Sequence, residues 1–211
     1  MTSQSKVIGL LLAAGQGSRF GGDKLLHPLR DGTPIGLQAA RNLAAQVDEL
    51  ICVVRPSDHA LQALFNAEGF TVLPNPEHLT GLSSSLKAGV AFRPDAAYWL
   101  IGLGDMPFIQ PASYLAVRHA LNQELTQAVD EQRLLRTCVN NHHGHPCALP
   151  QRCRAELMSL SGDSGAARLF KQAKQNTVQL IGIDDHGVLQ DIDQACDLIP
   201  TLPSAATANT Q

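Results

Sequence analysis

Short apolar runs alternate with amphipathic segments along the first 125 residues of this chain. Uninterrupted apolar stretches, typical of strands in a parallel sheet, occupy residues 6–13, 49–55, 70–73 and 98–103. Apolar positions at helical spacing occupy residues 34–46, 57–68, 82–92 and 111–125. We expect Thr33 and Ser57 to cap the first two of these helices, with Pro34 at the first helical position. The alternation predicts an α/β fold, a single-domain, open, mostly parallel Rossmann-like sheet flanked by helices.

The alternation is harder to follow after residue 130. A strand is expected at 134–139, followed by a loop rich in His, Gly and Pro that extends to Pro146. Further expected elements are helices near 152–160 and 165–174, a strand at 177–183 and a short helix at 194–199. The small, polar segment 201–211 is expected to be a disordered tail. One domain at residues 1–200 is the prediction for a chain of 211 residues.

Charge and composition exclude several classes of partner. The formal net charge is -3 and Lys and Arg form no block, so a nucleic acid partner is not expected. The apolar run near the start, residues 7–14, is too short to span a bilayer and lacks the features of a secretion signal, so we expect a cytoplasmic protein and no membrane partner. The five cysteines form no CxxC pair, which favours reduced thiols. The spacing of His142, His143, His145, Cys147 and Cys153 lacks the paired ligands of a zinc site, and we interpret them as loop histidines and buried thiols.

A glycine-rich segment, LAAGQGSRFGGDK, directly follows the first predicted strand. Open α/β sheets bind their ligands at the carboxyl ends of their strands. Glycines allow backbone N–H groups to approach an anion, and Arg19 and Lys24 add positive charge. The segment therefore predicts a site for a polyphosphate such as a nucleoside triphosphate.

Two commoner phosphate-binding motifs do not fit this segment. The dinucleotide fingerprint requires glycine where Phe20 stands, and the acid expected about twenty residues later is absent, because the second strand ends at Arg55. A P-loop requires Lys directly after its last glycine, but Asp23 follows Gly22 here.

The longer segment LAAGQGSRFGGDKLLHPLRDGTPI resembles the N-terminal signature of the MobA-like nucleotidyltransferases. The resemblance continues, in order, at Asn75 and Pro76, and at GLSSSLKAG (81–89), LGDMP (103–107), GHP (144–146) and QDIDQACDL (190–198). It spans most of residues 6–198 and implies the fold type of nucleotide-diphospho-sugar transferases. In that fold we expect a nucleotide-binding half at about 6–110 and an acceptor-binding half at about 111–199.

The resemblance also implies a role for each matching residue. Lys24 and Arg19 are the expected catalytic cations, and Mg²⁺ or Mn²⁺ is the expected cofactor. Asp105 and Asp193 are the expected metal ligands, with Asp191 less favoured; Gln194 and Ala195 replace the usual Thr-Pro of this segment. Gly144, His145 and Pro146 are expected to contact the acceptor. The residues expected to bind the nucleotide are Leu12, Ala13, Ala14, Gly15, Gly17, Ser18, Arg19, Gly22, Lys24, Asn75, Gly81, Ser83, Ser84, Ser85 and Asp105.

Within the family, LAAG and GLSSSLKAG are similar to the segments of members that use CTP, whereas guanylyl-transferring relatives tend to have LAGG. The methyl group of Ala14 narrows the space for a base, which is compatible with a pyrimidine. The resemblance thus implies transfer of CMP from CTP to the terminal phosphate of molybdopterin with release of pyrophosphate, as in molybdenum cofactor cytidylyltransferases. A molybdoenzyme that receives the product is a further expected partner.

Three alternatives stay open at this point. The first keeps the reaction and changes the acceptor to a sugar or alcohol phosphate, such as methylerythritol phosphate. The second is an NAD(P)-dependent oxidoreductase in which Arg55 pairs with a 2'-phosphate, and the missing fingerprint glycine argues against it. The third is a non-catalytic factor that delivers cofactor to a molybdoenzyme, and the presence of Lys24, Asp105 and Asp193 argues against it.

Overall fold

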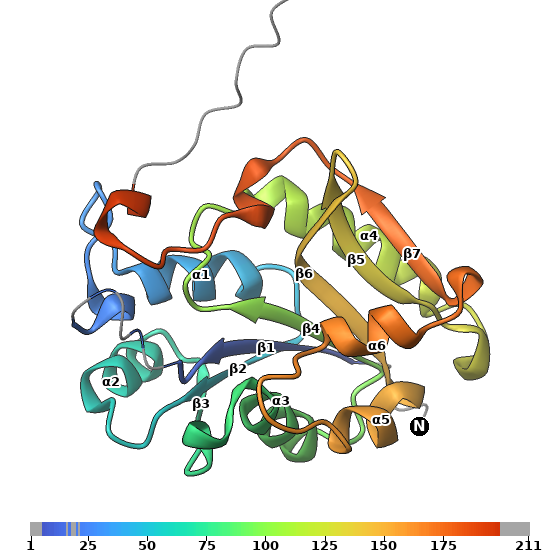
Figure 1. Ribbon diagram of the computed structural model, residues 1–211, viewed down its shortest axis with the longest axis horizontal. Helices are drawn as coiled ribbons and strands as arrows, with labels where there is room; N and C mark the ends of the chain where they lie inside the picture. The colour runs from blue at the N-terminus through green and yellow to red at the C-terminus, as the bar shows by residue number, and fades with distance from the viewer. Residues whose placement is uncertain (1–5, 16, 18–19, 21, 199–211) are drawn as a thin grey trace, which may run out of the picture.

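The computed structural model describes residues 6–15, 17, 20 and 22–198, and in this part of the chain it forms a seven-stranded sheet of order β3-β2-β1-β4-β6-β5-β7 (Figure 1). The pairs β1–β2, β2–β3, β1–β4 and β5–β7 are parallel, and β6 is antiparallel to both β4 and β5. The strands are β1 Val7–Ala13, β2 Glu49–Val54, β3 Thr71–Pro74, β4 Tyr98–Leu103, β5 Leu134–Val139, β6 His142–Pro150 and β7 Val178–Gly182. The predicted open, mostly parallel α/β sheet is confirmed.

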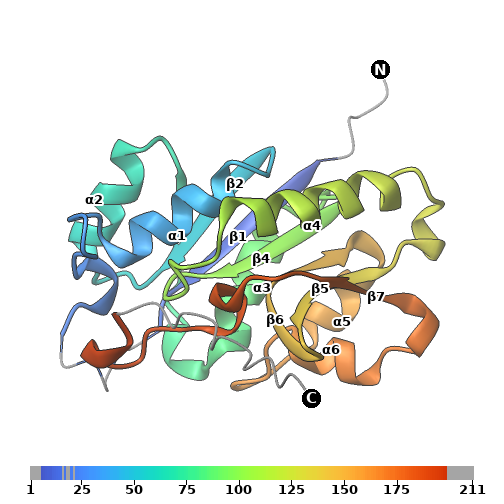
Figure 2. The same cartoon turned by 90° about the horizontal axis from the view of Figure 1, so that it is seen from above.

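Helices cover both faces of the sheet. Figure 2 shows α1 (Ile35–Ala44), α2 (His59–Ala67) and α4 (Pro111–Glu124) on one face, and α3 (Leu82–Phe92), α5 (Arg154–Met158) and α6 (Ala167–Gln172) on the other. Short 3-10 helices lie at Lys24–Leu26, His78–Thr80, Val129–Glu131, Gln151–Cys153, Gln175–Thr177, His186–Leu189 and Ala195–Leu198. The expected helices near 152–160, 165–174 and 194–199 therefore contain short helical segments.

The apolar run of β1 forms the centre of the core because both of its faces are covered. Val7 and Leu11 pack in the cluster that includes α1, α2 and α4, whereas Ile8 and Leu10 pack in the cluster that includes α3, α5 and α6. All seven residues of β1 are buried. Burial of one large aliphatic side chain contributes about 1.5–3 kcal/mol, so this strand holds the two helical layers to one sheet.

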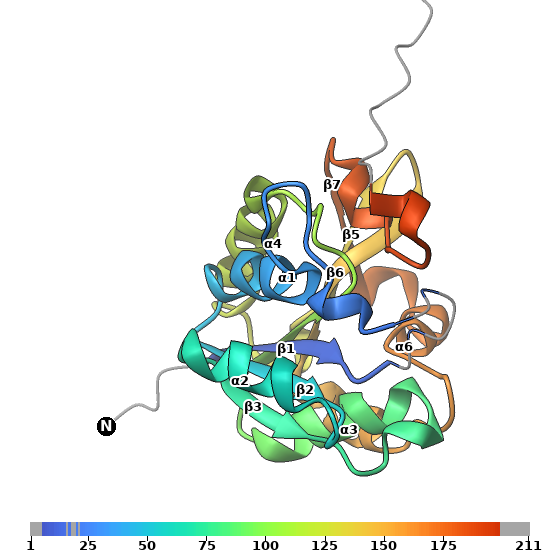
Figure 3. The same cartoon turned by 90° about the vertical axis from the view of Figure 1, so that its left-hand side faces the viewer.

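The strand order places a topological switch point beside β1. From β1 the chain continues through α1 to β2 and β3 on one side, and then returns through α3 to β4 on the other side of β1. Figure 3 shows α1 and α3 on opposite sides of β1. Connections therefore leave the carboxyl ends of β1 and β4 in opposite directions, and the crevice between them is where doubly wound sheets bind ligands.

The starts of the first two helices differ from the prediction. α1 begins at Ile35 with Pro34 in the N-cap position and no side-chain cap bond, so Thr33 is not its cap. The N–H of Thr33 instead donates to Oδ1 of Asp31 at 2.9 Å, and Pro28 and Pro34 form a bridge that closes this turn. Here the geometry of the turn overrides the capping preference of threonine.

The second helix starts one residue later than its predicted cap implies. Asp58, not Ser57, holds the N-cap position of α2, which begins at His59. The N–H of Asp58 donates to the carbonyl of Arg55 at 3.2 Å, so the chain is still in a turn at Ser57.

The predicted loop up to Pro146 is wrong, because residues 142–150 form the interior strand β6. Asn140 and Asn141 have φ values of 47° and 65°. Two consecutive residues at positive φ make the tight hairpin turn whose twist matches its strands, and asparagine tolerates that conformation. The turn therefore returns the chain directly along β5.

The sequence predicted a disordered tail and no membrane partner. The tail 201–211 lies outside the described residues. Within the described ranges, no helix combines the length and the apolar character needed to cross a bilayer.

Candidate active site

A pocket of about 500 Å³ opens at the carboxyl ends of β1, β2 and β4. Its walls come from the turn after β1, from the start of α2, from the start of α3 and from the segment after β4. The predicted site residues in its lining are Leu12, Ala13, Ala14, Gly15, Gly17, Gly22, Lys24, Gly81, Ser85 and Asp105. Ser18 and Arg19 lie outside the described residues. Segments far apart in the chain thus meet at the switch point.

Lys24 lies at the centre of the charged part of this pocket. It is the first residue of the 3-10 helix Lys24–Leu26, and its side chain is 11% exposed. Its Nζ donates to Oδ2 of Asp105 at 2.8 Å and lies 3.6 Å from Oδ1 of Asp193. The ammonium group is therefore held by charge-assisted contacts from two distant segments, and its position is fixed before any substrate arrives.

Asp105, Asp191 and Asp193 form an acidic triad whose ligand atoms all lie within 4.8 Å of one another. In the described part of the chain they are the group of His, Cys, Asp or Glu that could hold a metal ion. Desolvation, and then the charges of Asp105 and Asp193, raise the pKa of Asp191, whereas Lys24 lowers it. Three carboxylates and one ammonium leave a formal charge of about -2, which favours a divalent cation.

The sequence ranked Asp191 below Asp105 and Asp193 as a metal ligand, but the structure places all three together. Asp191, the less favoured ligand, lies within the same group as Asp105 and Asp193. The neighbouring N–H of Ile192 donates to the backbone carbonyl of Asp105 at 2.9 Å, which brings this segment against the end of β4. Cys147 and Cys153 are buried in the core, as the sequence indicated, whereas His142, His143 and His145 lie on strand β6 and not in a loop.

The start of α3 forms the opposite wall of the pocket. Nδ2 of Asn75 donates to Oγ of Ser84 at 2.9 Å and to Oγ of Ser85 at 3.1 Å, and Ser84 in turn donates to the carbonyl of Gly81. Ser85 lines the pocket, whereas Asn75, Ser83 and Ser84 are buried behind the lining. This network orients the first turn of α3 and leaves Ser85 facing the pocket.

Gly81 allows two segments to meet beside the pocket. It has φ 103° and ψ 175°, and an added Cβ would overlap the backbone of Gly162 and lie 2.8 Å from N of Asp163. The N–H of Ser83 donates to the carbonyl of Gly162 at 3.1 Å, and Asp163 lines the pocket. Gly81 therefore determines how closely the segment after α5 approaches α3.

We expect Gly81→Ala to destabilise the fold by about 3 kcal/mol or more, because a side chain is strained at this φ and ψ and also collides with backbone. Urea unfolding measures the change. Gly69→Ala is the matched control, since Gly69 has φ 78° but nothing within 4 Å of an added Cβ, and should cost about 1 kcal/mol. Equal losses in the two variants would contradict a steric role for Gly81.

Gly144, His145 and Pro146, expected near the acceptor, lie on β6 beside β4 and outside the pocket lining. His145 is partly buried, and its Nδ1 lies 3.5 Å from the carbonyl oxygen of Ile101. Burial, with a smaller contribution from the charge of Arg136, lowers the pKa of His145 to about 4, although the Ile101 carbonyl and Asp105 act in the opposite direction. The imidazole is therefore neutral at pH 7.

The low pKa of His145 makes the stability of the fold depend on pH. In the unfolded chain this histidine binds a proton below about pH 6.5. In the folded chain it binds that proton only below about pH 4. Stability is thus lost as pH falls from 6.5 to 4, on the order of 3 kcal/mol over the interval. Urea unfolding at pH 7 and pH 5 should show a smaller loss for His145→Gln than for the original chain. His119→Gln, at an exposed position of α4, should follow the original chain, and an unchanged pH dependence in His145→Gln would refute the assignment.

Sequence reasoning missed several pocket residues. The first residues of α2 line the pocket beside Arg55, which the sequence suggested as a ligand contact only for the oxidoreductase alternative; the one available signal was their position after β2, at the same sheet edge as the glycine-rich turn. Nε of Arg55 donates to Oδ2 of Asp58 at 2.7 Å, and its NH2 group lies 3.8 Å from Oδ1 of Asp23. No pattern in the sequence pointed to Asp163, because it is next to the pocket only as a result of the backbone contact between Gly81 and Gly162.

An open sheet that holds a glycine-rich turn, a fixed lysine and a carboxylate group at its switch point has the parts that the class of α/β nucleotidyltransferases needs to bind phosphates and a divalent ion. The chain belongs to the family of the MobA-like NTP transferase domain, whose model matches residues 9–178. The predicted family and the predicted enzyme class are confirmed.

Relatives in this family have different names. The nicotine blue oxidoreductase of Paenarthrobacter nicotinovorans is 31% identical over 194 residues, covering 89% of this chain and 92% of the relative. The purine catabolism protein PucB of Bacillus subtilis is 28% identical over 199 residues, covering 89% and 91%. A probable molybdenum cofactor guanylyltransferase of Thermococcus gammatolerans is 34% identical over 109 residues, covering 50% and 51%. The likeness to proteins named for molybdenum cofactor chemistry is therefore partial.

A solved structure shows the same fold over nearly the whole chain. Rv0371c of Mycobacterium tuberculosis is 27% identical, with a TM-score of 0.74 and coverage of 92% of this chain and 96% of that one. The same protein has been solved in complex with manganese, in a structure that covers 91% of this chain and 95% of that one at 24% identity, with a TM-score of 0.70.

Proposed function

We propose that this enzyme transfers CMP from CTP to the terminal phosphate of molybdopterin and releases pyrophosphate. The observation that carries the proposal is the fixed contact between Lys24 and Asp105 inside a pocket at the switch point, with Asp191 and Asp193 beside it. This arrangement supplies a cation for phosphates and a carboxylate group for a divalent ion within one crevice.

The acidic triad fits the expected Mg²⁺ or Mn²⁺. Carboxylate oxygens are the donors that both ions prefer, and the three ligand atoms are close enough together to share one ion. Asp105, Asp191 and Asp193 would hold it. When bound, such an ion supplies charge neutralisation for a nucleoside triphosphate.

The residues of this chain can then perform the transfer by positioning and charge. A phosphate oxygen of the acceptor attacks the α-phosphorus, a new P–O bond forms, and the bond to the β-phosphate breaks as its electron pair leaves with pyrophosphate. Lys24 neutralises the negative charge that develops on the leaving group. Gly15, Gly17 and Gly22 line the pocket without side chains, so the backbone can approach the phosphates closely. No protein nucleophile is required.

The preference for CTP is supported by the wall beside the glycine-rich turn. Ala14 lines the pocket at a position where glycine would carry no methyl group, and that methyl group narrows the space for a base. A pyrimidine needs less width than a purine. Such a steric preference contributes about 1–3 kcal/mol, and Ser85 adds a hydroxyl that can bond a base edge.

The direct test is pyrophosphate release from each of the four NTPs with magnesium and molybdopterin. Turnover that requires molybdopterin and is fastest with CTP is the expected result. Equal turnover with GTP would reject the pyrimidine preference, and turnover only with a sugar or alcohol phosphate would reject the acceptor.

An NAD(P)-dependent oxidoreductase is the second candidate, favoured by the 31% identity with the nicotine blue oxidoreductase. The contacts of Arg55 with Asp58 and Asp23 argue against its pairing with a 2'-phosphate, since both carboxylates already neutralise it. A nicotinamide-dependent absorbance change without pyrophosphate release would favour this candidate.

A further inference from the structure

The segment from Asp185 to Asp193, which we name the C-terminal strap, carries two of the three aspartates of the acidic triad. It follows β7 and runs toward the switch point, across the ends of β4 and β6 (Figures 1 and 2). The strap has no strand pairing and only one 3-10 turn, His186–Leu189, so its course depends on contacts with other segments.

Asp185 fixes the beginning of the strap. It is 5% exposed, and its Oδ2 accepts bonds from N of Gln110 at 2.8 Å and from Oγ of Ser113 at 2.5 Å. Its Oδ1 accepts a bond from N of Gly187 at 2.9 Å. A buried carboxylate is costly unless such donors satisfy it, so these bonds tie the strap to the start of α4.

Close packing fixes the middle of the strap. An added Cβ at Gly187 would overlap the carbonyl of Phe108, and one at Gly144 would overlap the carbonyl of Val188. The strap therefore lies in direct backbone contact with the segment after β4 on one side and with β6 on the other. Side chains at these two glycines would push it away from both.

The end of the strap meets the first triad residue. The N–H of Ile192 donates to the carbonyl of Asp105 at 2.9 Å, which sets Asp191 and Asp193 on either side of the contact. The segment 105–113 thus holds the strap at both ends, through Asp105 at one end and through Gln110 and Ser113 at the other. Asp185 is absent from the pocket lining, so it can affect the triad only through the course of the strap.

We propose that Asp185 is a positioning residue that sets the spacing of the acidic triad by anchoring the C-terminal strap to the segment after β4. The inference rests on the proposed function, since it assumes that the triad binds a divalent ion. The competing explanation is that Asp185 only stabilises the start of α4.

The test is calorimetric titration of Mn²⁺ alone into the full chain and into Asp185→Asn. Asparagine keeps the size of the side chain but places an amide where a carboxylate oxygen accepted a bond. Loss of a residue that orients metal ligands costs about 10- to 100-fold in metal affinity, and we expect a loss of that size. With saturating metal, kcat should recover while the apparent KM for metal stays raised.

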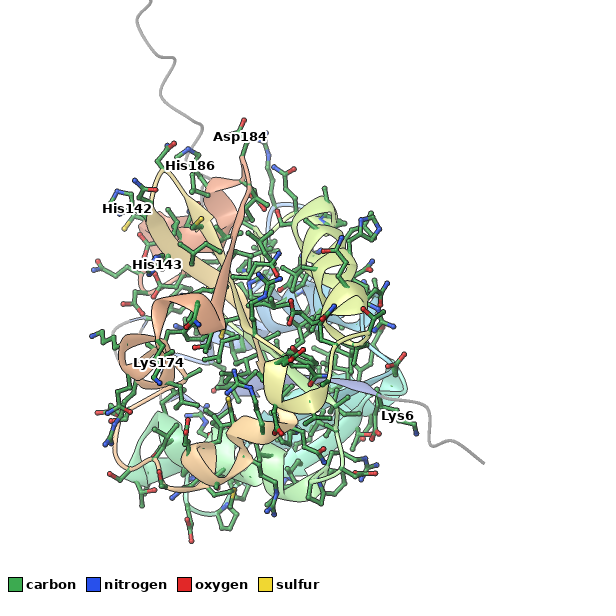
Figure 4. All side chains as sticks on the ribbon, turned by 90° about the vertical axis from the view of Figure 1, so that its right-hand side faces the viewer. Lys6, His142, His143, Lys174, Asp184 and His186 are labelled. Carbon is green, nitrogen blue, oxygen red and sulfur yellow. The ribbon has the colours of Figure 1, made fainter. Side chains whose placement is uncertain are left out.

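Asp184→Asn is the matched control. Asp184 is exposed, and Figure 4 shows it at the outer end of the molecule. This variant removes the same charge one residue away, so Mn²⁺ affinity within twofold of the original chain is the expected result. An equal loss in both variants would assign the effect to net charge and overturn the proposal.

Other outcomes separate this inference from the proposed function. If the original chain binds no Mn²⁺, the metal site itself fails and the inference fails with it. If the original chain and Asp185→Asn bind Mn²⁺ equally, while the variant unfolds at lower urea, Asp185 only stabilises α4. If Asp185→Asn does not fold, Ser113→Ala is the second variant, because it removes one of the three hydrogen bonds to Asp185. We expect it to weaken Mn²⁺ binding about fivefold. Unchanged Mn²⁺ binding in Ser113→Ala would then overturn the proposal.

Discussion

Replacement of Lys24 by methionine should lower kcat/KM for nucleotidyl transfer by about 10²- to 10³-fold, the loss typical of one preorganised charge donor. The Nζ group of Lys24 is 2.8 Å from Asp105 and is held mostly out of solvent, so nearby water cannot replace it without reorganisation. Methionine keeps much of the side-chain length and packing while it removes the charge. Pyrophosphate release at varied CTP concentration measures the change.

The same variant should bind Mn²⁺ more tightly than the original chain does. In the original chain the ammonium group competes with a metal ion for Asp105 and Asp193. Its removal leaves the three carboxylates without that cation, so activity and metal affinity should change in opposite directions. A fall in both would indicate collapse of the site instead of loss of one charge.

Lys171→Met is the control for this experiment. Lys171 is an exposed lysine on α6 and lies outside the pocket lining, so the same substitution there should leave both measurements unchanged. Lys24→Arg keeps the charge but not the shape, and we expect it to recover part of the activity. Full activity in Lys24→Met would exclude Lys24 from the catalytic machinery.

The fold up to β5 could be read from the sequence because most of its elements have simple periodicities. The expected helix at 82–92 and the expected strands at 98–103 and 134–139 match α3, β4 and β5. In this region each buried strand is one apolar run and each helix has one apolar stripe, so local pattern and tertiary contacts agree. Turns obscured the pattern at Thr33, Ser57 and the hairpin at Asn140 and Asn141.

β6 was missed because its sequence contradicts its environment. The residues HHGHP would suit an exposed loop, yet the strand lies between β4 and β5. Gly144 is required there by the close approach of the C-terminal strap, and that contact joins residues far apart in the chain. No local rule could reveal it.

The candidate site was predictable where it lies on the ends of strands. Lys24 and Asp105 follow β1 and β4, which are adjacent in the sheet, so any doubly wound order that pairs these strands brings the two residues together. Asp163 and Asp185 could not be found in this way. Each depends on how an irregular segment of the second half packs, through Gly81 in one case and through Gln110 and Ser113 in the other.

Asp105→Asn should lower kcat/KM by about 10³-fold or more, since this carboxylate serves both the proposed metal ion and Lys24. Asparagine keeps the shape of the side chain but replaces the carboxylate with a neutral amide, so the lysine contact weakens and the triad loses one negative charge. Unlike Lys24→Met, this variant should also bind Mn²⁺ more weakly, and calorimetry together with pyrophosphate release measures both changes. Asp130→Asn is the control. Asp130 lies on an exposed 3-10 helix outside the pocket lining, so this variant should change neither activity nor Mn²⁺ affinity. If raising the magnesium concentration restored full kcat/KM to Asp105→Asn, its carboxylate would serve metal affinity alone, and the contact with Lys24 would have no part in the chemical step.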